Sequence, residues 1–346
     1  GSEANDSQIK MLRYYANAIG KPEKKKIIAL DRGYHGVTVA AAALTGLPVM
    51  HSHFDLPVDA LGILRADCPH YFRGRVDAET EEEFVERLLK NLQQLIHDEG
   101  ADTIVAFVAE PLMGAGGVVV SPQGYLPQVQ SLLNENDIFL WADEVICGFG
   151  RTGSDFGSTT MGIQPDIMSL AKQLSSAYVP ISAAVIPGAM YEAMIDQSAE
   201  VGVFGHGYTY TGHPVACAAA LKALEIYERD GLFARAAKQG AYLQSRLQEF
   251  ASHELVGEVR GKGLIGAVEL VADKGTGQAF ADGKVGAFAQ RACQDEGLLL
   301  RAVAGNSVAF CPPLIIEEAQ IDEMIEKFAR ALDASLEFAR QEKLIC

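Results

Sequence analysis

Residues 166–174 read DIMSLAKQL, a short apolar run that ends in Lys172. Residues 137–145 read DIFLWADEV, a second apolar run, which ends in the acidic pair Asp143 and Glu144. Open α/β sheets bind their ligands outside the carboxyl ends of their strands. The two runs therefore predict strands of an α/β sheet that carry a lysine and a carboxylate to the ligand-binding edge.

The side chains at these strand ends indicate a chemistry. Lys172 follows a strand that should be buried, and burial disfavours the charged form of a lysine. A neutral lysine amine is a nucleophile that forms a Schiff base with an aldehyde. Taken alone, Lys172 would more often be a solvated surface group, and the acidic pair could end a strand or bind Mg²⁺. No complementary cluster of carboxylates or histidines is present, so we expect no metal.

Two N-terminal segments add to this pattern. In GSEANDSQIK (1–10), Gly1 and Ser2 precede an amphipathic helical stretch that continues to Ala16. The N–H groups and dipole of a helix N-terminus bind phosphate, and a serine hydroxyl adds a donor, although an ordinary N-cap is the commoner explanation. In RGYHGVT (32–38), Tyr34 offers a flat ring that could stack on a planar ligand or pack in the core.

Seven segments, in one order, resemble the class III aminotransferases, which are pyridoxal-phosphate enzymes of fold type I. The resemblance is to the branch of ω-amino acid or amine:pyruvate transaminases, and it runs from Gly1 to about Arg330. The segments are GSEAND (1–6), RGYHG (32–36), AEPLMGAGGV (109–118), WADEVICGFGRTG (141–153), PDIMSLAKQL (165–174), HGYTYTGHP (206–214) and GLLLRAV…CPP (297–313).

The resemblance implies a role for each matching residue. Lys172 and Asp143 are the implied catalytic pair, in which Lys172 forms the Schiff base with pyridoxal 5'-phosphate and Asp143 pairs with its pyridine nitrogen. That ion pair keeps the nitrogen protonated and the ring an electron sink. By the same resemblance, Tyr34 and Val145 cover the two faces of the ring, Gly1 and Ser2 bind the phosphate, and Glu110 is an acidic residue near the cofactor. Thr209 contacts the phosphate of the partner subunit's cofactor, and Arg301 binds a substrate carboxylate.

The resemblance also implies a reaction and an assembly. We expect ping-pong transfer of an amino group from an amine or ω-amino acid to a keto acid, in a homodimer or a dimer of dimers. Ala115 stands where relatives that use 2-oxoglutarate often have a glutamate, so the expected acceptor is pyruvate. Ser176 and Ala177 stand where many relatives have a glycine, which should alter the loop after Lys172. The alternatives are an aminomutase or decarboxylating enzyme on the same fold, or a non-catalytic fragment, because the family's segment before GSEAND is absent.

Length and pattern predict two domains. A chain of 346 residues exceeds the ~250–300 residues at which a single core stops growing. We expect a large cofactor-binding domain over residues 1–230, with a mainly parallel sheet flanked by helices, and a smaller C-terminal α/β domain over residues 231–346. The strands of the large domain are expected in KIIALD, TIVAFVAEP, DIFLWADEV, DIMSLA and ISAAVIP.

Charge and cysteine usage exclude several classes of partner. The net charge of −16, with no basic stripe, argues against binding to nucleic acid or an anionic membrane. Six scattered cysteines are typical of free thiols in a reducing cytosol, and no run of ~18 apolar residues is present, so a cytoplasmic protein is expected. The histidines at 51, 53 and 70 and Cys68 lack regular metal-ligand spacing.

Overall fold

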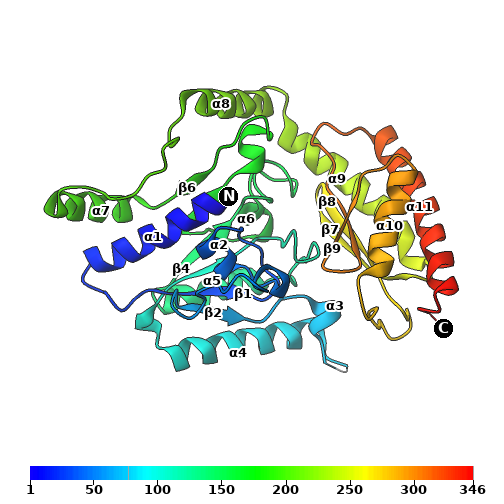
Figure 1. The fold of residues 1–346 in the computed structure, drawn as a ribbon, viewed down its shortest axis with the longest axis horizontal. Coiled ribbons are helices and arrows are strands. Elements are labelled where there is room, and N and C mark those ends of the chain that lie inside the picture. The colour runs from blue at the N-terminus through cyan, green and yellow to red at the C-terminus, as the bar shows by residue number, and fades with distance from the viewer. Residues whose placement is uncertain (77, 346) are drawn as a thin grey trace. The chain divides into compact units, whose positions relative to one another are not determined.

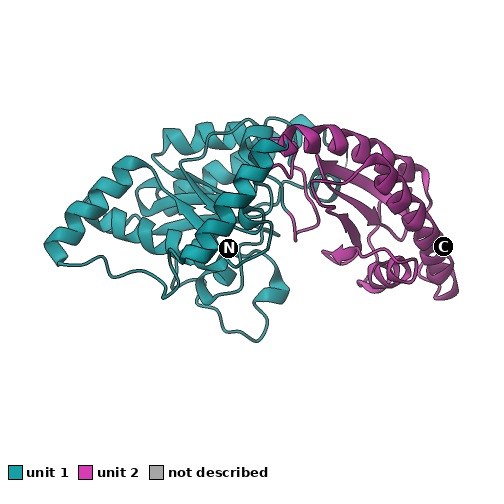
Figure 2. Ribbon diagram, turned by 90° about the horizontal axis from the view of Figure 1, so that it is seen from above, with its two compact units in different colours: residues 1–113, 121–149, 156–230 teal, residues 114–120, 150–155, 231–346 magenta. Residues whose placement is uncertain are grey.

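The computed structural model describes residues 1–76 and 78–345, which form two compact units. Figure 2 shows the first unit, which comprises Gly1–Met113, Ser121–Phe149 and Phe156–Asp230. The second unit comprises Gly114–Val120, Gly150–Asp155 and Gly231–Cys346. The units therefore do not follow one cut in the sequence, because two short glycine-containing loops of the N-terminal part pack with the C-terminal part.

The first unit is built on a six-stranded sheet of order β2-β1-β3-β4-β5-β6 (Figure 1). All neighbouring strands are parallel except β5 and β6, so the predicted α/β fold with a mainly parallel sheet is confirmed. The strand β2 was not expected, because its four residues, ILRA, include the charged Arg65. The strands are β1 (Lys26–Leu30), β2 (Ile63–Ala66), β3 (Ile104–Ala109), β4 (Phe139–Asp143), β5 (Ile167–Leu170) and β6 (Ala183–Val185).

Helix α1 (Ser2–Ala18) packs on this sheet through the apolar stripe that the sequence indicated. Ile9, Leu12 and Ala16 are all buried, and Ile9 and Leu12 share one core cluster with Trp141 of β4. The remaining helices of the unit are α2 (Val39–Leu44), η1 (Pro48–Met50), α3 (Tyr71–Gly74), α4 (Glu81–Glu99), η2 (Ala101–Thr103), α5 (Tyr125–Glu135), α6 (Gly157–Met161), η3 (Lys172–Ser175), α7 (Gly188–Val201) and α8 (Pro214–Arg229).

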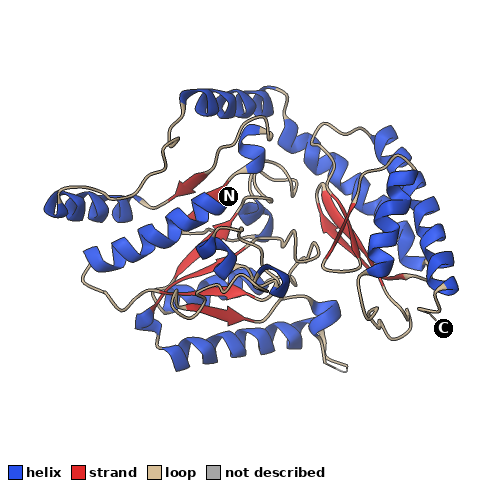
Figure 3. Ribbon diagram, viewed as in Figure 1, coloured by secondary structure: helices blue, strands red, loops and turns tan. Residues whose placement is uncertain are grey.

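The second unit contains a four-stranded antiparallel sheet of order β7-β8-β10-β9. Helices α9 and α10 pack on this sheet, and α11 packs on both helices (Figure 3). The smaller C-terminal α/β domain is thus confirmed. The elements are α9 (Leu232–Gln248), η4 (Glu249–Ser252), β7 (Val256–Lys262), β8 (Ile265–Leu270), α10 (Lys284–Asp295), β9 (Arg301–Val303), β10 (Ser307–Phe310) and α11 (Glu318–Gln341).

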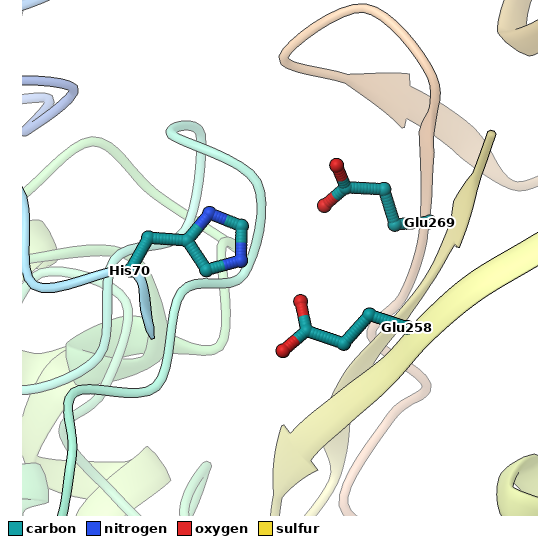
Figure 4. A group of neighbouring side chains, drawn as sticks. All are labelled: His70, Glu258 and Glu269. Atoms are coloured by element: carbon teal, nitrogen blue, oxygen red, sulfur yellow. The ribbon is translucent and has the colours of Figure 1, made fainter. Parts of the chain in front are cut away.

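Two buried arginines hold the glycine-containing loops in the second unit. Arg260 of β7 donates to the carbonyl oxygens of Gly117 and Val118, and it forms ion pairs with Glu258 and Glu269, whose side chains Figure 4 shows. Arg151 donates to the carbonyl oxygens of Leu264 and Pro312, so this arginine braces its loop. The loops therefore have a structural function within this unit.

The sequence predicted free thiols, and its histidines showed no metal-ligand spacing. No disulfide joins the five described cysteines, Cys68, Cys147, Cys217, Cys293 and Cys311, whereas Cys346 lies outside the described residues. His51 has its Nε2 atom 3.0 Å from the Ala42 carbonyl oxygen and 2.7 Å from the Thr45 carbonyl oxygen, so it stabilises the end of α2. Within residues 1–76 and 78–345, no helix is long and apolar enough to cross a membrane.

Candidate active site

A cavity of about 430 Å³ lies where several strands of the first unit end. Its walls come from the segments that follow β1, β3, β4 and β5, together with the start of α1. Parallel strands direct their carboxyl ends to one edge of a sheet, so segments distant in sequence meet there. Seven of the nine predicted site residues line this cavity: Gly1, Ser2, Tyr34, Glu110, Asp143, Val145 and Lys172.

Asp143 ends β4 and is only 3% exposed. Its Oδ2 atom lies 2.8 Å from Nδ1 of His35 and 3.0 Å from Nδ2 of Asn5, and its Oδ1 atom accepts from the Val145 N–H at 3.1 Å. An ionised carboxylate only accepts hydrogen bonds, so it pairs with the tautomer of His35 that carries its proton on Nδ1. These three contacts fix the orientation of a buried carboxylate on the cavity wall.

The sequence reasoning missed Asn5 and His35. Both are buried polar residues that line the cavity, and both lie inside segments that were quoted for their neighbours. Buried polar side chains need hydrogen-bond partners, so a polar residue beside a predicted site residue was the available signal. The sequence could not identify Asp143 as the shared partner, because it lies 138 residues from Asn5 and 108 from His35.

Glu144 points away from this arrangement, as alternation along a strand requires. It is fully buried, and its carboxylate accepts hydrogen bonds from the N–H groups of Gly157 and Ser158 at 2.9 and 2.6 Å and from the Ser158 hydroxyl. Burial raises the pKa of Glu144, although the hydrogen bonds from Ser158 and Gly157 oppose this shift. Glu144 therefore caps the start of α6, and the adjacent acids do not converge on one ion.

Lys172 lines the cavity, but the prediction that its side chain is buried is wrong. β5 ends at Leu170, and the chain turns directly into η3 with Lys172 in a left-handed conformation at a φ of 44°. Ala171 is the last buried residue before the turn, and the Lys172 side chain is exposed on the cavity wall. Its amine can therefore meet a ligand or water without displacing core atoms.

The start of α1 forms another wall of the cavity. Gly1 is the N-cap residue, and the first N–H groups of a helix have no partners within the helix. The Ser2 hydroxyl accepts a hydrogen bond from the Val37 N–H at 3.1 Å. An added Cβ at Gly1 would lie 3.1 Å from the Val145 side chain, so the backbone approaches that residue closely. This wall offers backbone and hydroxyl donors to an anionic group.

Substitution of Gly36 should disturb this anion site. Gly36 has a φ of 134°, and an added Cβ would lie 2.5 Å from Ser2 Oγ and 2.9 Å from the Ala41 side chain. We expect Gly36→Ala to lower the free energy of unfolding by about 1–3 kcal/mol, as in other overpacked sites. Urea denaturation tests this, with Gly188→Ala as control because no atom lies within 4 Å of its added Cβ. Equal stability of the two variants would contradict the expectation.

Two predicted residues do not line this cavity. Thr209 lies in the exposed segment between α7 and α8, where it borders a separate surface cavity with Lys10 and His206. Arg301 is exposed at the start of β9 in the second unit. Their roles, and those of the other site residues, stay predictions.

Comparisons with known proteins identify the family. The family model for Aminotransferase class-III matches residues 1–332. The chain belongs to the class-III aminotransferases. The predicted resemblance is therefore confirmed over almost the whole chain.

This class-III aminotransferase is similar to transaminases of a plant and a bacterium. It is 46% identical to "Gamma aminobutyrate transaminase 1, mitochondrial" of Solanum lycopersicum over 333 residues. The aligned region covers 96% of this chain and 64% of that protein. It is 44% identical over 338 residues to "Diaminobutyrate--2-oxoglutarate transaminase" of Halomonas elongata, with 96% of this chain and 72% of that protein covered. The chain thus spans less than two thirds of the Solanum relative's length.

Solved structures of similar sequence share the fold. The structure of the omega transaminase from Pseudomonas jessenii in complex with PMP superposes with a TM-score of 0.95 at 51% identity, covering 98% of this chain and 74% of that chain. A structure described as "Transaminase with L-ala" has a TM-score of 0.94 and 51% identity, and covers 96% of this chain and 78% of its own.

Proposed function

We propose that this chain forms the catalytic part of a pyridoxal-phosphate-dependent transaminase, which moves an amino group from an amine or ω-amino acid to a keto acid. One observation carries the proposal. The exposed Lys172 side chain, the buried Asp143 carboxylate and the N-terminus of α1 line the same cavity. These are a nucleophile, an anion and a phosphate-binding element, and a class-III aminotransferase needs all three.

The cavity residues fit pyridoxal phosphate. When bound, this cofactor supplies an aldehyde and a protonated ring that withdraws electrons from the substrate carbon. Asp143 would hold the ring nitrogen's proton, and His35 and Asn5 would keep the carboxylate in place. The N-terminus of α1 and the Ser2 hydroxyl would hold the phosphate. The close approach of Gly1 to Val145 supports this fit, because a larger residue would fill the space between them.

The protein groups divide the chemical work. The Lys172 amine would hold the cofactor through its aldehyde group. Lys172 Nζ would accept the proton from the donor carbon as a general base and return it to the cofactor carbon as a general acid. Asp143, buried on the cavity wall, would stabilise the positive ring. Glu110, which accepts a hydrogen bond from the Tyr34 N–H at 2.9 Å, fixes the backbone of the residue expected to stack on the ring.

Substrate choice is the finer part of the proposal. One relative is named for gamma aminobutyrate, which is an ω-amino acid, and one solved neighbour is a transaminase with L-Ala, which is the amino product of pyruvate. The Halomonas relative carries 2-oxoglutarate in its name, which is the competing acceptor. Ala115 has no side-chain carboxylate. It therefore cannot form an ion pair with Arg301 when the bound substrate lacks a second carboxylate. We therefore propose pyruvate as the preferred acceptor.

Steady-state kinetics test the function and the acceptor together. We expect a higher kcat/KM for pyruvate than for 2-oxoglutarate, with an ω-amino acid or amine as donor. Loss of a charge-assisted contact to a carboxylate is worth about 1.5–3 kcal/mol, so Arg301→Ala should lower the kcat/KM for the keto acid roughly ten- to hundredfold. The exposed Arg291 of α10 supplies the control, Arg291→Ala.

Three outcomes would overturn parts of this proposal. A preference for 2-oxoglutarate contradicts the acceptor assignment, and unchanged kinetics in Arg301→Ala remove its carboxylate-binding role. Conversion of the donor without consumption of any keto acid would favour an aminomutase or a decarboxylating enzyme. Failure to bind pyridoxal phosphate would favour a non-catalytic fragment.

We also propose that the enzyme acts as a homodimer or a dimer of dimers, with Thr209 reaching the partner subunit's cofactor. Supporting this, several large apolar side chains of α7 and the following segment are exposed: Tyr191, Ile195, Val201, Val203 and Tyr210. Exposed apolar clusters of this kind mark interaction surfaces. The cytoplasmic location remains a prediction from cysteine usage.

A further inference from the structure

The turn that carries Lys172 is strained. Three of its non-glycine residues have left-handed backbone conformations, with φ angles of 44° at Lys172, 51° at Ser176 and 60° at Ala177. Such conformations cost free energy and persist only where surrounding contacts determine them. The position of the Lys172 amine thus depends on the contacts that keep this turn in its strained conformation.

Hydrogen bonds within the turn supply part of that restraint. The Ser176 N–H donates to the Gln173 carbonyl oxygen at 3.1 Å, and the Ala177 N–H donates to the Lys172 carbonyl oxygen at 3.1 Å. The Ser175 hydroxyl donates to the Val179 carbonyl oxygen at 2.8 Å. These bonds close the turn on itself, but none of them connects it to another element of the unit.

Tyr227 makes that connection. It lies on α8, and its hydroxyl donates to the Gln173 carbonyl oxygen at 2.7 Å and accepts from Gln173 Nε2 at 3.1 Å. The tyrosine is only 4% exposed, and burial raises its pKa although hydrogen bonds with Ser176 and Gln173 oppose the shift, so the hydroxyl stays protonated and able to donate. One side-chain oxygen therefore holds both the backbone and the side chain of Gln173.

The burial pattern of α8 supports a role for this contact. The buried residues of this helix are Ala220, Ala223 and Tyr227, spaced by three and four positions, which places them on one face. α8 packs against η3. The apolar face of α8 is thus directed to the turn that carries Lys172.

We propose that Tyr227 is a positioning residue, whose hydroxyl holds the strained turn through Gln173 and thereby sets the position of the Lys172 amine. The inference rests on the proposed function, because Lys172 is taken as the nucleophile. Tyr227 and Gln173 do not line the cavity, so the effect on chemistry is transmitted through the backbone of η3.

The test is Tyr227→Phe, which removes only the hydroxyl, in three measurements. Hydrogen exchange of the Ser176 and Ala177 amides should speed up about tenfold without cofactor, as expected for the loss of one hydrogen bond. Acetic anhydride labelling of Lys172, followed by mass spectrometry across pH, should show a changed rate and pH midpoint. The rate constant for reaction of Lys172 with added pyridoxal phosphate should fall about tenfold.

Two further variants separate positioning from general damage. Ala177→Gly in the Tyr227→Phe background relieves the left-handed strain at residue 177 and should restore part of the reaction rate. Tyr71→Phe is the matched control, because the Tyr71 hydroxyl also donates to a backbone carbonyl oxygen, that of Glu79, at 2.7 Å. It should leave all three measurements unchanged.

The results that test the positioning role of Tyr227 can be distinguished from those that test the proposed function. If the unaltered protein does not react with pyridoxal phosphate, the proposed function fails, and amide exchange and Lys172 labelling alone then judge the positioning role. If Tyr227→Phe leaves exchange and labelling as they are, or if Tyr71→Phe changes them equally, the inference is overturned.

Discussion

Replacement of Lys172 by alanine is expected to reduce transamination to the background rate. The variant keeps the buried core, because Lys172 is exposed on the cavity wall, but it loses the amine that we propose to attack the cofactor aldehyde and to carry the proton. Loss of a nucleophile that also acts as base removes most of the rate enhancement, commonly several orders of magnitude. Stopped-flow absorbance with pyridoxal phosphate and single-turnover assays with a donor amine measure the two losses separately.

The control for this prediction is Lys222→Ala. Lys222 is a lysine of α8 whose side chain is 59% exposed and pairs with Glu225, so its loss should alter neither measurement. Turnover in Lys172→Ala close to that of the unaltered protein would remove Lys172 from the mechanism. Thermal unfolding of both variants should match, since neither change creates a cavity in the core.

Asp143→Asn is the second prediction with a large effect. The substitution keeps the shape of the side chain and removes the charge that holds the ring nitrogen's proton. Buried, preorganised electrostatic groups contribute about 3–4 kcal/mol to transition-state stabilisation, so we expect kcat to fall roughly a hundred- to a thousandfold. The amide also presents hydrogen-bond donors towards His35 and Asn5, which both donate to Asp143 in the native site.

Because the new amide faces two hydrogen-bond donors, the stability of the Asp143→Asn variant must be measured as well as its kinetics. Asp137→Asn is a suitable control, because the Asp137 carboxylate also binds two donors, Lys21 and Lys24, but does not line the cavity. Both variants can lose stability, whereas only Asp143→Asn should lose turnover. A reduction of less than tenfold in kcat would count against Asp143 as the partner of the ring nitrogen.

The sequence predicted the central part of the fold because the strands at the middle of a parallel sheet are buried on both faces. The six residues of β3 are all buried, and its continuous apolar run is distinct from the helical pattern around it. The edge strand β2 was missed for the converse reason. It is short, and Arg65 interrupts its apolar pattern while donating to the carbonyl oxygens of Ala43, Leu44 and Thr45.

For the site, the sequence determined which residue types follow each strand, and the parallel order of β1, β3, β4 and β5 brought Tyr34, Glu110, Asp143 and Lys172 to one cavity. Such an arrangement depends on parallel strand pairing, which the sequence predicted, and on the order of the strands, which the structure supplies. The sequence could not determine the exposure of Lys172, because burial depends on where β5 ends and on the turn that follows.

Only the tertiary structure decided how the functional groups are held. His35 and Asn5 reach Asp143, and Tyr227 reaches Gln173, across 54 to 138 residues of chain. A hydrogen bond acts only over about 3 Å and within a narrow range of angles, so no spacing in the sequence specifies it. The residues that we propose to perform the chemistry could thus be named from the sequence, whereas the residues that hold them in place are fixed by the packing of distant elements.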